Sequence, residues 1–206
     1  MVTTLRIGSR RRQIWRRRAL ALAALIGLPV LVIAAWPLAT RVIEHFELPL
    51  RYAPLIRQQA TAKHLDPALI AAVIYAETRF RPRTSPTGAE GLMQIEPATA
   101  RFLARRSGGF HFRLADLDAP AVNIAYGAYY LRYLLNTYSG SMVLALAAYN
   151  GGETNVDAWL ASARAEHRRF AAADIPLSQT RAYVSEVLSE QRAYRRRYAR
   201  QLGYSG

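Results

Sequence analysis

Residues 68–76, Ala68-Leu69-Ile70-Ala71-Ala72-Val73-Ile74-Tyr75-Ala76, are apolar throughout, and a single carboxylate, Glu77, follows them. Asp66 and Pro67 in front of this run are typical of a helix N-cap and first turn, so the sequence predicts a helix over 67–78. Because its residues leave little polar face, the helix should be buried. The run therefore predicts a helical domain built around this segment.

Glu77 falls in the last turn of the predicted helix. The negative end of the helix dipole and partial desolvation both disfavour ionisation there, so we expect a raised pKa. A carboxylic acid with a raised pKa is what general acid catalysis on a glycosidic oxygen requires. The alternative is an ordinary surface glutamate at a frayed helix end.

Three further segments accompany Glu77. The block ETRFRP at 77–82 is followed by SPTGAEGLMQIEPATA at 85–100, AYNGG at 148–152 and IPLSQTRAYV at 175–184. In this order the motifs resemble the soluble-type lytic transglycosylases, over roughly residues 52–198. The resemblance implies an all-α, lysozyme-like domain that cleaves the glycan strands of peptidoglycan without a cofactor.

The resemblance also implies roles for individual side chains. Glu77 is the implied catalytic acid, and the implied substrate-binding residues are Ser85, Gln94, Tyr149, Asn150, Gln179 and Tyr183. Gln94 would bind an acetamido group from the first turn of its helix, while Tyr149 and Asn150 would face Glu77 across a cleft. Met93 is expected in the core. Structural alternatives are a polar residue near a helix N-terminus for Gln94 and a buried, satisfied tyrosine for Tyr149.

Four positions depart from the family pattern. The stretch before Ser85 is one residue shorter, and Thr78 replaces the serine that usually follows the catalytic glutamate. Gln179 stands where glutamate is common, which keeps hydrogen bonding but loses the charge. Glu96 stands where methionine is common and adds a carboxylate near the expected cleft.

The chemistry implied by the resemblance uses one carboxylate, whereas ordinary glycosidases use two. Glu77 would protonate the oxygen between N-acetylmuramic acid and N-acetylglucosamine, then take a proton from the C6 hydroxyl as a 1,6-anhydro ring closes. One alternative is a hydrolase of the goose-lysozyme kind, whose water-activating residue would be Glu90, Glu96, Asp116 or Asp118. A non-catalytic wall-binding module is the other, motivated by Gln179.

Composition sets the remaining bounds. The chain has 206 residues, of which 51% are hydrophobic and 20% charged, as in a globular protein. There is no cysteine, which excludes disulfides and thiol chemistry. The four histidines, His45, His64, His111 and His167, lack ligand spacing, so we predict no metal site.

The N-terminal segment predicts a membrane anchor. Residues 1–18 contain seven arginines and no acid, and residues 19–39 are apolar and uncharged. Such a run can span a bilayer, with the arginines on the cytoplasmic side. A cleaved signal peptide is the alternative. We therefore predict a basic N-terminus (1–18), a transmembrane anchor (19–39), a linker (40–51) and a catalytic domain (52–206) outside the bacterial inner membrane.

The net charge is +14, but half of the excess lies in residues 1–18, leaving 21 Lys and Arg against 14 acids, or +7. This remainder suits an anionic partner, such as peptide stems of the wall or lipid head groups. Nucleic acid is not expected, because no binding motif is present. The arginines from Arg192 to Arg200 fit a solvated helix face, with docking to membrane or wall as the alternative.

Helical periodicity extends over most of the chain after residue 51. We predict helices over 52–64, 67–78, 91–106, 119–138, 141–149, 153–163 and 179–202, with Asp118 as an N-cap of the fourth. No strand pattern of useful length is present. Gly88 and Gly91 are expected at turn positions that need a positive φ.

Overall fold

The computed structural model describes residues 48–109 and 111–204. The chain divides into two compact units, Met1–Leu48 and Pro49–Gly206, and the described residues belong, apart from Leu48, to the second. The predicted basic N-terminus, the anchor over 19–39 and most of the linker lie outside them. In the described part of the chain, no helix is both long and apolar enough to cross a bilayer.

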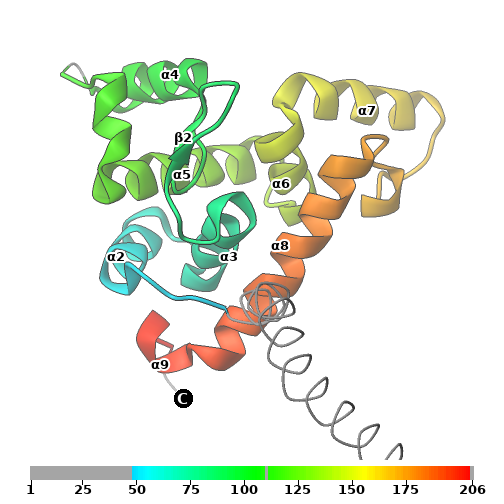
Figure 1. Ribbon diagram of the computed structural model, residues 1–206. Coiled ribbons are helices and arrows are strands. Elements are labelled where there is room, and N and C mark those ends of the chain that lie inside the picture. The colour runs from blue at the N-terminus through cyan, green and yellow to red at the C-terminus, as the bar shows by residue number, and fades with distance from the viewer. Residues whose placement is uncertain (1–47, 110, 205–206) are drawn as a thin grey trace, which may run out of the picture. The chain divides into compact units, whose positions relative to one another are not determined.

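The described domain is mainly helical, as predicted (Figure 1). Its α-helices are α2 (Ala53–Lys63), α3 (Pro67–Thr78), α4 (Pro97–Ser107), α5 (Pro120–Thr137), α6 (Met142–Gly151), α7 (Glu153–Ala165), α8 (Ser178–Arg197) and α9 (Ala199–Leu202). Two 3-10 helices, η1 (Leu114–Asp118) and η2 (Ala172–Asp174), and two short antiparallel strands, β1 (Arg83–Thr84) and β2 (Glu90–Gly91), complete it.

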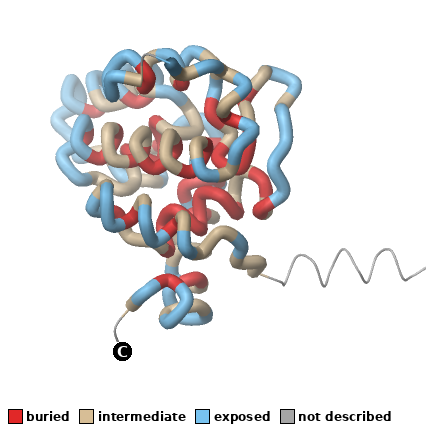
Figure 2. Tube along the Cα trace, turned by 90° about the vertical axis from the view of Figure 1, so that its left-hand side faces the viewer, coloured by how far each residue is buried: buried red, intermediate tan, exposed pale blue. Residues whose placement is uncertain are grey.

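Helix α3 lies at the centre of the fold, and residues 68–75 are all buried (Figure 2). Its N-cap is Asp66, whose side chain accepts a hydrogen bond from the Ala68 amide at 2.9 Å, and Pro67 occupies the first turn. The helix ends where Arg79 turns left-handed, at φ 51°. Sequence therefore predicted this helix with its correct ends, because capping and burial favour the same boundaries.

Helices α3 and α8 pack along each other and are tied at both ends. Asp66, before α3, accepts hydrogen bonds from Gln191 (2.6 Å), Arg195 and the Tyr204 hydroxyl. At the other end of α3, Arg79 pairs with Glu186 of α8 at 3.1 Å. The residue before α3, Asp66, contacts the C-terminal part of α8, and the residue after α3, Arg79, contacts its first half. The two helices therefore run antiparallel.

The predicted helix over 179–202 is wrong as one element. It breaks at Tyr198, which has φ −122° and ψ 30°, and continues as α9. The change of direction brings the Tyr204 hydroxyl back to Asp66 and to the Ala68 amide (3.2 Å), so a contact with a residue far away in sequence accompanies the break.

The predicted helix over 91–106 starts too early, since α4 begins at Pro97. Gly91 has φ 75°, as predicted, and backbone hydrogen bonds in both directions between Glu90 and Ile95, each 3.0 Å, close a tight turn there. Gln94, at φ 49°, is therefore in this turn and not in a helix. The N-cap of α5 is Ala119, not Asp118, because Pro120 takes the first helical position.

Asn123 of α5 holds this turn in place and is fully buried. Its side-chain oxygen accepts a hydrogen bond from the Met93 amide (2.9 Å), and its amide nitrogen donates to the carbonyls of Glu90 (2.9 Å) and Leu117 (3.1 Å). A Cβ on Gly91 would come within 2.0 Å of that nitrogen. The turn is thus bonded to the core through one amide side chain.

Candidate active site

A cleft of about 520 Å³ opens where four segments of the domain meet. They are the end of α3, the loop over 85–96, the end of α6 and the start of α8, and α4 and α5 add one residue each. The residues that line it are Glu77, Ser85, Thr87, Ala89, Gln94, Ile95, Glu96, Thr99, Tyr130, Ala148, Tyr149, Asn150, Gly151, Gly152 and Gln179. The cleft thus brings together six of the seven side chains singled out from the sequence, leaving out Tyr183.

Glu77 occupies the last turn of α3, as predicted. Burial raises the pKa of its carboxyl to about 7, while the Tyr183 hydroxyl and the positive charge of Arg83 lower it and the negative charge of Glu186 raises it. At neutral pH a large fraction of this carboxyl therefore carries a proton, as a general acid requires.

Tyr183 lies outside the cleft lining, on the buried side of Glu77. Its hydroxyl has no partner of ordinary hydrogen-bond geometry among the described residues, yet it is close enough to lower the Glu77 pKa by hydrogen bonding. Burial and the nearby Glu77 charge raise the pKa of this tyrosine well above its usual value. The position suits a neutral hydroxyl that orients the carboxyl better than a group that contacts a sugar.

The Gln94 side chain is fixed by its own loop. Its amide nitrogen donates to the carbonyls of Arg83 (2.7 Å) and Gly91 (2.9 Å). Both of its N–H donors are thereby used, and the side-chain carbonyl is left as an acceptor. In the cleft this oxygen can receive the N–H of an acetamido group.

Tyr149 and Asn150 form the wall from α6. The Tyr149 hydroxyl donates to the Met93 carbonyl at 2.8 Å, and its ring packs on Tyr130 with centroids 5.2 Å apart. Asn150 accepts a hydrogen bond from the Thr180 hydroxyl at 2.9 Å, which leaves its amide N–H groups as donors. Met93, which receives the bond from Tyr149, is fully buried, as expected.

Ser85 lies at the rim of the cleft. Its hydroxyl accepts a hydrogen bond from the Ala89 amide (2.9 Å) and is 2.9 Å from the Thr87 hydroxyl. Sequence reasoning had not assigned Thr87, Thr99 or Tyr130 to the site. Thr87 and Thr99 belong to the motif over 85–100, but Tyr130 comes from α5, outside all of the recognised motifs.

The cleft lining contains two carboxylates, Glu77 and Glu96, and neither lysine nor arginine. The Glu96 carboxylate is exposed and has no hydrogen-bond or ion-pair partner in the described ranges. The other acids considered as water-activating groups lie elsewhere: Glu90 accepts from Thr84 (2.8 Å), Asp116 pairs with Arg113 (3.6 Å), and Asp118 is exposed. Within residues 48–109 and 111–204, no group of acids or histidines could hold a metal ion.

Comparison with known proteins agrees with this geometry. The sequence model of the Transglycosylase SLT domain matches residues 54–170. The chain belongs to this family. Among SLT-domain relatives, the soluble lytic murein transglycosylase of Escherichia coli (strain K12) is 32% identical over 164 residues, which are 77% of this chain and 25% of that protein. The membrane-bound lytic murein transglycosylase C of Yersinia enterocolitica is 32% identical over 71% of this chain and 47% of its own length.

Solved structures of SLT-domain proteins have the same fold. The soluble lytic transglycosylase SLT70 of Escherichia coli superposes with a TM-score of 0.68, at 30% identity over 77% of this chain and 26% of that one. The lytic transglycosylase Slt of Pseudomonas aeruginosa, as an inactive mutant, superposes with a TM-score of 0.67, at 32% identity over 74% of this chain and 25% of that one. The chain thus spans about a quarter of these two proteins.

Proposed function

We propose that this SLT-domain protein is a peptidoglycan lytic transglycosylase that cleaves the bond between N-acetylmuramic acid and N-acetylglucosamine. The observation that carries the proposal is the Glu77 carboxyl, whose pKa burial raises to about 7, in a cleft lined by amides and hydroxyls. Relatives named lytic murein transglycosylases support it. So does the inactive Pseudomonas aeruginosa mutant, in which glutamine replaces a glutamate.

In the proposed reaction, the protonated Glu77 gives its proton to the glycosidic oxygen as the bond to C1 of the muramoyl sugar breaks. The acetamido group of the substrate stabilises the positive charge at C1. Glu77, now a carboxylate, accepts the proton of the C6 hydroxyl, whose oxygen closes onto C1 and forms the 1,6-anhydro ring. The carboxyl ends protonated and no water is consumed.

The surrounding groups orient the acid and the sugar. The Tyr183 hydroxyl, behind Glu77, favours the carboxylate formed in the first step, because hydrogen bonding stabilises the anion. The Gln94 carbonyl and the Asn150 amide offer an acceptor and a donor to the sugar. Tyr149 holds the Met93 carbonyl and so fixes the loop that carries Gln94.

The role of Glu96 distinguishes transglycosylation from hydrolysis, because a hydrolase would use this carboxylate as a base. A second carboxylate that activates water is needed in an inverting glycosidase. The proposed transglycosylation needs no such base, so it assigns Glu96 no part in the bond-breaking step.

Glu96→Gln should keep activity within about fivefold of wild type, since removal of a general base normally costs about 10²–10⁴-fold. Digests of purified wall glycan, analysed by mass spectrometry, should contain 1,6-anhydro ends with either protein. Reducing ends in place of anhydro ends, together with a loss of a hundredfold or more in Glu96→Gln, would identify a hydrolase.

The pH dependence follows from the raised pKa of Glu77. The free enzyme needs the protonated form, which is present below about pH 7 and is lost as pH rises through that value. The kcat/KM for cleavage should fall about tenfold per pH unit above this midpoint. It is measured from the initial rate of release of soluble fragments between pH 5 and 9, a range chosen to span the pKa by roughly two units on each side.

Gln179→Glu tests whether α8 contributes to this titration. Gln179 lines the cleft, so a carboxylate there should raise the Glu77 pKa by like-charge repulsion and move the midpoint upward. Gln179→Ala is the matched control and should leave the midpoint in place. Equal midpoints in all three proteins would show that residue 179 does not couple to Glu77.

We also propose that residues 19–39 anchor the chain in the inner membrane, with the domain on the outer side. The support is the uncharged run after seven arginines. Full-length protein should fractionate with membranes, and protease added from the outer side should degrade the domain. Intact protein in the soluble fraction, or a domain protected on the cytoplasmic side, contradicts the anchor.

A further inference from the structure

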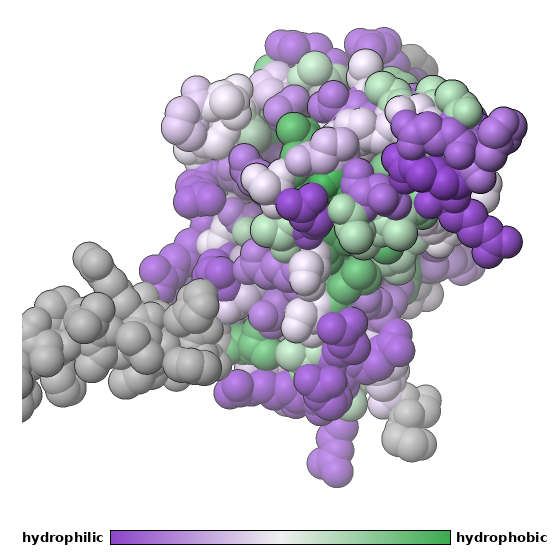
Figure 3. All heavy atoms as spheres, turned by 90° about the vertical axis from the view of Figure 1, so that its right-hand side faces the viewer, coloured by the Kyte–Doolittle hydropathy of each residue, from purple (hydrophilic) through white to green (hydrophobic). Residues whose placement is uncertain are grey.

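The end of the domain opposite the cleft is strongly basic. Its exposed arginines, here called the arginine end, are Arg51, Arg57, Arg192, Arg195, Arg196, Arg197 and Arg200. Two contacts bring together the segments that carry them, which are α2 with the residues before it, α8 and α9. The Tyr194 hydroxyl of α8 donates to the Pro49 carbonyl at 2.6 Å, and Arg57 of α2 donates to the Gln201 carbonyl of α9 at 3.4 Å. In Figure 3, hydrophilic residues make up most of this lower end of the molecule, beside a smaller hydrophobic area.

The charge at this end is poorly neutralised. Seven of the 20 Lys and Arg among the described residues lie there, but only two of the 12 acids, Asp66 and Glu190. The net charge is therefore +5 at this end and +3 over the other described residues. Arg195 is paired with Asp66. Arg51, Arg192, Arg196 and Arg200 make no hydrogen bond or ion pair within the described ranges. Such a concentration of free guanidinium groups attracts a polyanionic surface.

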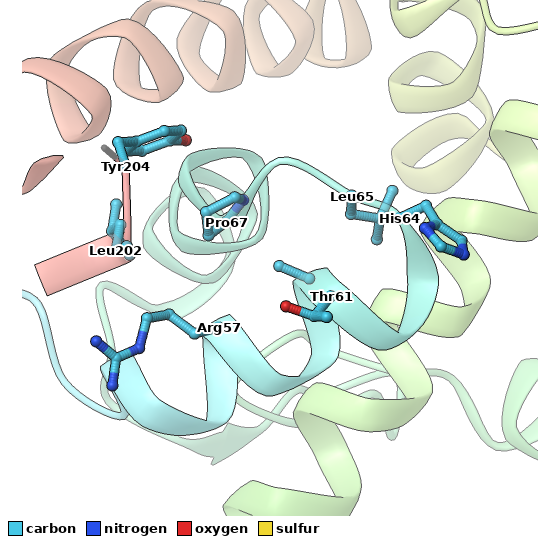
Figure 4. A pocket seen from close by; sticks show the side chains of 9 residues that line it. Arg57, Thr61, His64, Leu65, Pro67, Leu202 and Tyr204 are labelled. Carbon is cyan, nitrogen blue, oxygen red and sulfur yellow. The ribbon is translucent and has the colours of Figure 1, made fainter. Parts of the chain in front are cut away.

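The surface is also hollowed beside these arginines. A pocket of about 440 Å³ lies between α2, the start of α3 and the C-terminal residues, with Arg57 at one side and the Tyr204 hydroxyl at the other (Figure 4). Leu65, Pro67 and Leu202 contribute apolar lining. Arg57 thus places a positive charge at the edge of this hollow.

We propose that the arginine end docks on the anionic surface of a lipid membrane. Guanidinium groups bind phosphate in two-point hydrogen bonds, so phospholipid head groups match this surface in charge and geometry. The position of Pro49 favours a membrane over other polyanions. The domain begins at this residue, which contacts α8 among the arginines, and the sequence before it carries the apolar run over 19–39.

Docking in this way leaves the cleft open. Helix α8 contributes Gln179 of its first turn to the cleft and the arginines of its last turns to the docking surface. A membrane at one end of this helix therefore does not cover the other. The proposal concerns attachment alone and holds whether or not the cleft cleaves glycan.

Docking can be tested with a fluorophore at a single cysteine. Because the chain has no cysteine, Gln201→Cys creates one labelling site, at an exposed position of α9. Full-length protein carrying a fluorophore there is combined with vesicles that contain a head-group quencher. Quenching should be strong with phosphatidylglycerol, weak with phosphatidylcholine alone, and abolished by molar salt, which screens the attraction. A label at Ser178→Cys, next to the cleft, should stay unquenched.

Charge reversal at Arg192, Arg196 and Arg200 to Glu should lower the ratio of docked to free domain at least about a hundredfold, since the loss of each basic group near an anionic membrane costs about fivefold and each added carboxylate is repelled. The matched control reverses Arg101, Arg105 and Arg164, which are exposed elsewhere, and should dock like wild type. Equal quenching with both lipids, or equal losses in both triple variants, would overturn the proposal. Loss of quenching on addition of soluble wall fragments would overturn it too and indicate wall stems as the partner. The salt and lipid dependence is measured on protein with all of its arginines, so this part of the test does not depend on whether the triple variants fold.

Discussion

Glu77→Gln should lower the rate of glycan cleavage at least about a hundredfold, because the amide keeps the shape of the side chain but has no proton to give. The effect should appear in kcat, with glycan binding nearly unchanged. The measurement is the release of 1,6-anhydro fragments from purified peptidoglycan, together with a pull-down on the same material. Retention of more than about a hundredth of wild-type activity would mean that another group is the acid.

The same variant should not unfold more easily. A carboxyl whose pKa is raised from 4.5 to about 7 in the folded state stabilises the protein below its unfolded pKa, and this stability is lost as pH rises through 7. Glutamine carries no charge, so Glu77→Gln should melt at the same or a higher temperature than wild type at pH 8. Glu166→Gln, at an exposed and distant position, is the control for both measurements.

Asn123→Ala should cause the second large effect, on stability as well as activity. It leaves the buried Met93 amide and the Glu90 and Leu117 carbonyls without their partner, which should lower the free energy of unfolding by roughly 2–4 kcal/mol. Thermal denaturation should shift downward by roughly 5–15 °C. Because the loop that carries Gln94 is then free to move, KM should rise even at temperatures where the variant is folded.

Asn136→Ala is the matched control, since it makes the same change at an exposed position of the same helix. It should leave both the melting temperature and KM unchanged. If Asn123→Ala had the same melting temperature as Asn136→Ala and wild type, the hydrogen bonds of Asn123 would not be what holds the loop.

Much of the fold was predictable because its information is local. Helix α3 combines an N-cap, a first-turn proline and an apolar run, and these features agree on one element. Six of the seven predicted site residues line one cleft because the motifs that contain them end helices or form the loop beside them. The raised pKa of Glu77 likewise followed from its place at the end of a buried helix.

The errors arose where residues distant in sequence decide the local structure. The sequence of the turn before α4 predicts a helix. In the structure, the Met93 amide donates instead to the side chain of Asn123, about thirty residues later. The break at Tyr198 accompanies a contact of Tyr204 with Asp66, 138 residues earlier. Tyr130 has the spacing of a core residue, and its ring does pack on Tyr149, but its helix also faces the cleft. Periodicity alone does not distinguish these two environments.

The length of α8 gives the proposed enzyme a fixed reach. Gln179 lies in the cleft and Arg196 is 17 residues further along the same helix, which at about 1.5 Å per residue places the two roughly 25 Å apart. With Arg196 on the lipid surface, the cleft would lie at most about that distance above the bilayer. The length of α8 would then limit which glycan strands reach the cleft by their distance from the membrane, whatever their peptide stems.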